Sequence, residues 1–470
     1  KNSRFLWTIF LVVIISSCAT YSSKVKVDAA MADYPMEKQL EHRFFLIGDA
    51  GLSLDGTPSD ALKIFQQGVS NSTENDVVLF LGDNIYPNGL PEIGAKGRKD
   101  AEFQLNTQLN TVKDAHARVI FIPGNHDWYS GGIPGLERQE EYIESIIKEK
   151  KVFMPSDACG LEEVDISNSV HLIIIDSQWF LEDWDQHPTI NDDCEIKTRT
   201  KFFDEFEGIL KKNEGKTVVV AIHHPLNTYG THGGYFSADK HLFPFQSKVP
   251  LPGVGSLINQ TRKTGGVSVQ DVQNQRYREL TNRLEALAMV APANVIFASG
   301  HDHSMQYIEN ENYKQIIAGS GSKESPTKLT GDALFVSGKQ GYATLDVFKD
   351  GSVWVRYFSS RDSMAYLEFQ KQVYPAHKND FVGDFPDHYP EVVDASVYPT
   401  DKTIKSKAYE RFWGEHYRDI YGVPVRAKVA LLDTLHGGLN PVRKGGGHQT
   451  KTLRLEDPQG REYNMRTVKK

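Results

Sequence analysis

Five short clusters of aspartate, asparagine, tyrosine and histidine offer the side chains of a metal-binding site. Carboxylates mixed with imidazoles suit iron, zinc, manganese or nickel better than calcium or a thiolate-bound metal. One carboxylate can bridge two cations about 3.5–4 Å apart, which is the spacing used in two-metal hydrolysis. The clusters therefore predict a two-metal hydrolytic centre. The side chains that they supply are Asp49, Asp83, Tyr86, Asn125, His126, His223, His301 and His303.

Each cluster follows a short apolar run, rich in β-branched and aromatic residues, that predicts a buried strand. Helix-like segments lie between these runs, at 59–69, 137–151, 200–212 and 275–289. Alternating strands and helices predict an α/β layer structure, and ligands in such folds gather at the carboxyl ends of the strands. The strands expected to carry the clusters are 44–47, 77–81, 119–122, 218–222 and 295–298.

Further strands are expected beyond the last cluster, at 315–318, 343–348 and 353–358, with no clear helix between them. They indicate a second sheet packed against the first, as in a sandwich. Residues 361–470 are expected to form a C-terminal extension of mixed helix and a small β unit.

The chain has 470 residues, 39% of them hydrophobic, and a formal net charge of -8. This balance argues against nucleic acid as a partner, which favours a basic surface. It does not exclude a phosphate substrate, because bound metals would be the largest local charges in the site.

The first residues predict export. Lys1 and Arg4 precede an apolar run over 5–15, which is too short to span a bilayer comfortably. The run meets Ile-Ser-Ser-Cys18, which resembles the lipobox of bacterial lipoproteins. That resemblance implies a signal peptide over 1–17, a lipidated Cys18, a tether over 18–41 and a membrane-anchored protein of the bacterial cell envelope, periplasmic or surface-exposed. The alternatives are an ordinary signal peptide and an uncleaved anchor.

Two other cysteines, Cys159 and Cys194, remain. Outside the cytoplasm such a pair can form a disulfide. Two independent buried thiols are an equally open alternative, because no motif decides between them.

The order of the clusters over 42–305 resembles the calcineurin-like metallophosphoesterase superfamily. The matching motifs are Asp-x-Gly, Gly-Asp-x-x-Tyr, Gly-Asn-His-Asp, x-His-x-Pro and Gly-His-x-His. The chain is more similar to the purple acid phosphatase (tartrate-resistant acid phosphatase-like) branch, because Gly51 replaces the usual histidine and Tyr86 follows Asp83 by three residues. This resemblance implies a four-layer α/β/β/α sandwich, with the metallophosphoesterase domain over 42–360.

The resemblance also assigns ligands to two metals. The first metal, iron(III) in that branch, would be held by Asp49, Asp83, Tyr86 and His303. The second metal, Fe(II), Zn or Mn, would be held by Asp83 as a shared bridge, with Asn125, His223 and His301. A metal-bound hydroxide would then attack phosphorus.

Other residues receive roles around the metals by the same resemblance. His126 would face the substrate, stabilising the transition state or protonating the leaving oxygen, and Asp127 would hold the other nitrogen of its ring. His232 and Asn84 would contact the substrate, although Asn84 has the alternative of a turn residue. His224 is expected to be structural or to support the ligands from outside the metal site.

Three functions remain open on the sequence. The first is an exported phosphatase acting on phosphomonoesters of small molecules or phosphoproteins. The second is a phosphodiesterase or nucleotide hydrolase with the same metals. The third is a non-catalytic binding module, whose signature would be missing ligands; the predicted ligand set is complete.

Overall fold

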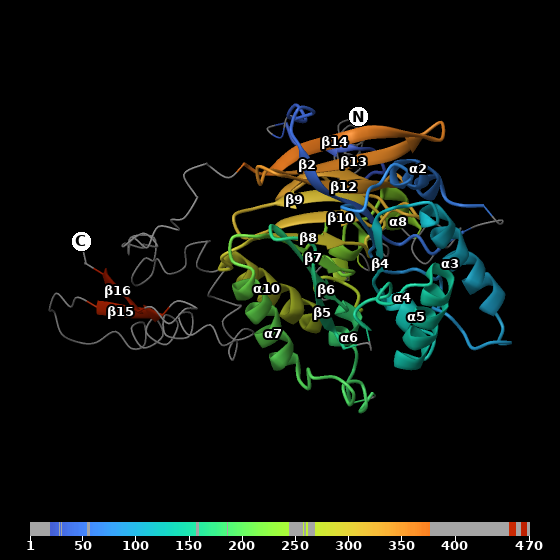
Figure 1. Cartoon of the computed structure of the whole chain (residues 1–470), viewed down its shortest axis with the longest axis horizontal. Coiled ribbons are helices and arrows are strands. Elements are labelled where there is room, and N and C mark those ends of the chain that lie inside the picture. Colours follow the sequence, from blue (N-terminus) through green and yellow to red (C-terminus); the bar gives the residue numbers. More distant parts are fainter. Residues whose placement is uncertain are drawn as a thin grey trace, which may run out of the picture.

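The computed structural model describes residues 19–27, 29, 31–53, 57–156, 159–185, 187–243, 257, 260, 261, 268–376, 451–456 and 462–467. Two mixed sheets form the centre of the molecule, with helices along their flanks (Figure 1). The expected signal peptide over 1–17 and the lipidation site Cys18 lie outside the described residues.

The six-stranded sheet combines strands from the beginning and from the end of the predicted domain. Strands β2, β3 and β4 run parallel and form one half of the sheet, with β4 at its edge. Strands β12, β13 and β14 are added antiparallel on the other side of β2. The strands, in spatial order, are β14 (Met364–Tyr374), β13 (Val353–Arg361), β12 (Gly341–Phe348), β2 (Leu40–Ile47), β3 (Val77–Phe80) and β4 (Arg118–Phe121).

The eight-stranded sheet is parallel through β6, β7, β8 and β10, and antiparallel at its other pairings. Its strands, in spatial order, are β1 (Lys24–Val25), β11 (Ala333–Ser337), β9 (Met305–Glu309), β10 (Lys314–Ala318), β8 (Asn294–Ser299), β7 (Thr217–Ile222), β6 (Val170–Ile175) and β5 (Leu161–Asp165).

Alternate residues of the strands divide between two hydrophobic clusters, as the two-residue period of a strand requires. In β2, Phe44 and Leu46 belong to a cluster built almost wholly of strand residues from both sheets, which is the core between the sheets. Phe45 and Ile47 belong to the cluster that includes the helices. Apolar side chains therefore pack on both faces of the sheets, one cluster between the sheets and the other including the helices. This confirms the predicted α/β class with two packed sheets.

The helices complete the layers. The long helices α7 and α10 lie along one flank of the molecule and α3 and α5 along another (Figure 1). The helices bounded within the described residues include α2 (Asp60–Val69), α3 (Arg98–Val112), α4 (Asn125–Trp128), α5 (Ile133–Ile147), α6 (Ser177–Leu181), α7 (Arg199–Lys212), α8 (Ala238–Leu242), α10 (Gln275–Met289) and the 3-10 turn η2 (Thr231–Gly233).

Segments outside 42–360 also pair with the two sheets. Before residue 42, β1 pairs with β11 and Thr20 bridges to Thr327. After residue 360, β14 adds to the six-stranded sheet. Near the C-terminus, β15 (Lys451–Glu456) pairs antiparallel with β16 (Glu462–Thr467). Among the described residues, none of the helices has the length and apolar character needed to cross a membrane.

The structure also decides the question that the cysteines left open. Cys159, just before β5, and Cys194, between α6 and α7, form a disulfide that closes a sequence separation of 35. This bond links the segment before β5 to the segment between α6 and α7.

Candidate metal centre

The candidate ligands lie on loops that leave the carboxyl ends of strands from both sheets. Asp49 and Asp83 follow β2 and β3, while His223 and His301 follow β7 and β8. Asp49, Asp83 and His301 have φ values of 57°, 54° and 68°, which lie in the left-handed region that non-glycine residues seldom occupy. Such conformations cluster at functional sites, where the surrounding structure holds them in place.

One group of side chains meets around the hydroxyl of Tyr86. This oxygen lies 2.9 Å from Asp49 Oδ1, 2.8 Å from Asp83 Oδ2 and 3.2 Å from His303 Nε2. His303 Nε2 also lies 3.5 Å from Asp49 Oδ1. All four ligands that the sequence assigned to the first metal are therefore gathered at one point.

A second group meets around His223. Its Nε2 lies 3.4 Å from Asp83 Oδ1 and 3.2 Å from Asn125 Oδ1. The ring of His301 lies beside that of His223, with 5.1 Å between the ring centroids. These are the four residues that the sequence assigned to the second metal.

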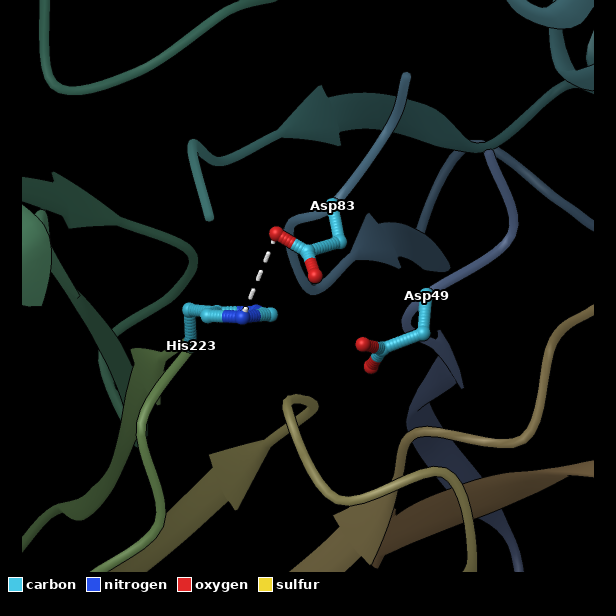
Figure 2. Close-up of side chains that lie close together, drawn as sticks. All are labelled: Asp49, Asp83 and His223. Atoms are coloured by element: carbon cyan, nitrogen blue, oxygen red, sulfur yellow. Dashed lines mark ion pairs between the residues drawn. The ribbon is translucent and has the colours of Figure 1, made fainter. Parts of the chain in front are cut away.

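Asp83 belongs to both groups, and each of its oxygens serves a different one. Oδ2 faces Tyr86 and Oδ1 faces His223. Figure 2 shows Asp49, Asp83 and His223 converging on a common space, and one ligand atom of each lies within 4.8 Å of the others. This is the arrangement expected of a carboxylate that bridges two cations.

The charges of the buried site fit metal binding. Burial, and then the neighbouring Asp83, raise the pKa of Asp49 well above its ordinary value. Two adjacent buried carboxylates are costly unless cations compensate them. Burial lowers the pKa of His223, His301 and His303, so that these rings are neutral at pH 7, as metal ligation requires.

Hydrogen bonds to backbone carbonyls indicate which ring nitrogen each histidine presents. His223 Nδ1 lies 2.8 Å from Leu81 O, so it carries the proton and leaves the lone pair on Nε2. His301 Nε2 lies 2.8 Å from Gln270 O, which leaves the lone pair on Nδ1. Such partners beyond the ligands fix the tautomer and orientation of a metal-binding histidine.

The position of Gly51 cannot hold a side chain. A Cβ at this residue would overlap the backbone of Asn84 and Ile85. The backbones interlock here, since Gly51 N donates to Asp83 O at 3.1 Å and Tyr86 N lies 3.3 Å from Gly51 O. A histidine ligand is therefore excluded at residue 51, while Tyr86 is held beside the carboxylates, in keeping with the exchange expected from the sequence.

His126 and Asp127 lie next to the centre, but not in contact with each other as expected. His126 Nδ1 donates to Pro87 O at 2.6 Å, and its Nε2 lies 3.9 Å from Asp83 Oδ2. Asp127 instead turns back to the start of α4, where it accepts from Gly124 N at 2.7 Å. The expected pairing of Asp127 with the His126 ring is therefore wrong, because α4 directs the two side chains to different sides.

The two residues expected to contact substrate differ in placement. Asn84 is fully buried and donates to Ile122 O and to Asp127, which corresponds to its turn-residue alternative. His232 lies at the centre's edge, with its ring stacked on that of His301 at 4.0 Å between centroids. His224 is buried against Ser177, as a structural residue would be.

Two residues near the ligands carry no signal in the sequence. Lys323, in the loop after β10, places Nζ 2.9 Å from the centroid of the Tyr86 ring. Burial, only partly offset by Asp49 and Asp83, lowers the pKa of Lys323 to about 8. Gln270 reaches the centre from the segment before α10. Both lie in loops without periodic pattern, and only the tertiary fold brings them to the ligands.

Comparison with known proteins identifies relatives for part of the chain. Residues 42–252 match the family described as calcineurin-like phosphoesterase. Purple acid phosphatase 3 of Arabidopsis thaliana is 26% identical over 209 residues, which cover 43% of this chain and 52% of the relative. The chain thus spans about half the length of that curated relative.

Comparison with solved structures finds similarity to two proteins of distant sequence. GAP50, the anchor in the inner membrane complex of Plasmodium, has a TM-score of 0.46 at 16% identity, covering 73% of this chain and 90% of its own. Purple acid phosphatase PPD1 from yellow lupin (Lupinus luteus) seeds has a TM-score of 0.43 at 14% identity, covering 72% of this chain and 55% of its own.

The matched residues contain the loops after β2, β3, β4 and β7, and hence most of the ligands described above. The possible Asp/His metal site thus includes residues of the segment that is similar to the calcineurin-like phosphoesterase family.

Proposed function

We propose that this protein is an exported hydrolase of phosphomonoesters that acts at a pair of metal ions, as purple acid phosphatases do. The observation that carries the proposal is the position of Asp83, whose two oxygens face two complete ligand groups. The group with Tyr86 suits iron(III), and the group with His223 suits Fe(II), Zn or Mn. When bound, the metal pair supplies a nucleophile from water near neutral pH and neutralises charge on the phosphate.

His126 is the side chain best placed to serve the leaving group. Because Nδ1 donates to Pro87 O, Nε2 carries a proton only when the ring is an imidazolium. Nε2 lies on the Asp83 side of the ring, and the side chain is 28% exposed, so it can meet a substrate at the centre's open edge. From Nε2 an imidazolium could donate a proton to the leaving oxygen.

Export and anchoring are proposed from the N-terminal pattern. The Cys159–Cys194 disulfide supports a location outside the cytoplasm, where such bonds persist. Lipidation at Cys18 would hold the enzyme at the bacterial cell envelope, acting on phosphorylated small molecules or phosphoproteins. Labelled palmitate should enter the protein expressed in a bacterium, and a Cys18→Ser variant that is labelled equally would contradict the anchor.

The catalytic proposal is tested by replacing two aspartates that flank strand β3. Asp83 follows the carboxyl end of β3, and Asp76, also buried, precedes its amino end. Asp83→Asn should lower nitrophenyl phosphate hydrolysis by more than about 100-fold, since loss even of residues beyond the ligands costs about 10–100-fold. Asp76→Asn should retain activity and metal content.

The colour and the substrate of the purified enzyme complete the test. A tyrosinate–iron(III) bond gives a pink to purple protein, so an active but colourless and iron-free enzyme would refute the Tyr86 assignment. Faster hydrolysis of bis-nitrophenyl phosphate than of the monoester would favour the phosphodiesterase alternative. Hydrolysis of neither ester after metal loading, with Asp83→Asn indistinguishable from wild type, would favour the binding-module alternative.

A further inference from the structure

Three imidazole rings pack against one another at the second ligand group, in what we call the three-ring stack. His301 lies between His224 and His232, with centroid distances of 4.3 Å and 4.0 Å and tilts of 43° and 34° between the ring planes. The sequence assigned a metal-binding role to His301 alone, a substrate role to His232 and a structural role to His224. Because the rings are in contact, a shift of His224 or His232 would move His301.

Gln270 contacts all three rings of this stack. Its backbone oxygen lies 2.8 Å from His301 Nε2 and 3.0 Å from His232 Nδ1, and accepts from both. Its side-chain Oε1 lies 2.6 Å from His224 Nε2. A single residue therefore sets the tautomers of two rings and anchors the third.

The side chain of Gln270 belongs to a directed chain of hydrogen bonds. Ser177 Oγ lies 2.7 Å from His224 Nδ1, and Gln270 Oε1 lies 2.6 Å from His224 Nε2. Because an amide oxygen can only accept, Nε2 carries a proton. His224 thus donates to Gln270 Oε1. Gln270 Nε2 donates to Gln178 Oε1 at 3.0 Å, and Gln178 donates in turn to Glu182 at 2.7 Å. Every donor meets an acceptor, so the chain fixes the orientation of Gln270.

We infer that Gln270 is a positioning residue for the second metal, which orients His301 as a ligand and His232 toward the substrate through one backbone oxygen. This inference rests on the proposed two-metal function. Its side chain helps to hold the backbone oxygen in place through the hydrogen bonds to His224 and Gln178. The backbone bond from Val272 N to His232 O at 3.2 Å joins the same segment to the three-ring stack. Loss of these anchors weakens the second metal site and leaves the first, built around Tyr86, intact.

Gln270→Met tests the inference, because it keeps the side-chain length and removes both amide hydrogen bonds. Zinc(II) is titrated calorimetrically into protein already loaded with iron(III). The zinc affinity should fall by about 10–100-fold, the range found when residues that orient metal ligands are replaced. The tyrosinate absorption band should be unchanged. Imidazole ¹⁵N spectra should show that the His301 ring has lost its fixed Nε2–H tautomer.

Asn213→Leu is the control. Asn213 is a buried amide whose Nδ2 donates to Ile209 O at 2.9 Å, but it lies between α7 and β7, at the end of β7 opposite to His223. This variant should lower the thermal stability and leave the zinc affinity unchanged. Equal loss of zinc affinity in both variants would mean that Gln270 acts only through general stability, and would overturn the inference.

Metal binding by the wild-type protein distinguishes a failure of the Gln270 inference from a failure of the proposed two-metal function. Wild-type protein that binds iron(III) and then zinc, alongside a Gln270→Met variant with the same affinities within about twofold, would refute the role of Gln270 alone. Wild-type protein that binds only one metal would refute the proposed two-metal function itself.

Discussion

At the scale of single residues, the conformation and packing of the backbone determine where the side chains of the candidate centre lie. Asp49, Asp83 and His301 occupy left-handed conformations, and Gly51 lies against the backbone of the loop that carries Asp83 and Tyr86. The ligands are therefore placed by the packing of loops on loops. A substitution that adds no charge can still disturb the metals by moving one loop against another.

Gly51→Ala is predicted to destabilise the fold by about 1–3 kcal/mol, as overpacking of a tight interior does. It should also weaken the tyrosinate band, because Gly51 bonds to the backbones of both Asp83 and Tyr86. Urea unfolding and absorption spectra measure the two effects. Gly208→Ala, in open space on α7, is the control and should stabilise the protein by about 0.5–1 kcal/mol. Wild-type stability in Gly51→Ala would contradict the packing argument.

At the scale of elements, β13 and β14 are joined by a charge cluster at Glu368. This side chain is 5% exposed and accepts from Lys339 Nζ at 2.9 Å, Ser359 Oγ at 2.6 Å and Arg361 at 3.1 Å. Burial alone would raise the pKa of Glu368, but these hydrogen bonds lower it from 4.5 to about 2. The folded state therefore favours the ionised carboxylate.

Because the pKa is lower in the folded state, the stabilisation by Glu368 is complete above pH 4.5 and disappears as the pH falls toward 2. Glu368→Gln should lower the free energy of unfolding by about 1.5–3 kcal/mol at pH 7. The difference from wild type should shrink below about pH 4.5. Urea unfolding at several pH values measures it, and Glu74→Gln, at an exposed site, is the control. A difference that does not depend on pH would contradict the assignment.

The elements also show what the sequence could and could not predict. The strand-end clusters predicted which side chains gather at the candidate centre, because parallel strands bring their carboxyl ends to one edge. Helix α3 is absent from the expected helices because its buried face is partly polar: Gln104 bonds to the backbone of Tyr86 and Gln108 to that of Asn84. A helix that supports a loop through amides lacks the apolar period on which the prediction depends.

Other features depend on the tertiary fold alone. The sequence could not assign each strand to its sheet, since β2 pairs with β12, about 300 residues later, through contacts that leave no local pattern. Gln270 and Lys323 are missed for the same reason. Neighbours in sequence also mislead, as Asp127 shows: it follows His126 directly but points to Gly124.

At the scale of the whole molecule, the disulfide constrains a long connection of the eight-stranded sheet. Replacing both Cys159 and Cys194 by serine should lower the free energy of unfolding by about 2–4 kcal/mol, because the unfolded chain regains the freedom of a loop with a separation of 35. Urea unfolding with and without dithiothreitol measures this. The reductant should destabilise wild type and leave the double variant unaffected; equal responses would contradict the prediction.

The ligands of each candidate metal come from both sheets. His303 joins Asp49 and Asp83 across the sandwich at the first group, and His223 joins Asp83 and Asn125 at the second. A bound ion would therefore cross-link the two sheets. Without it, they meet at this edge through contacts such as the hydrogen bond from Gly48 N to Ala318 O. The apo protein should open there first and be cut by proteases sooner, so that in a metal-poor environment the lifetime of the protein would report the supply of metal.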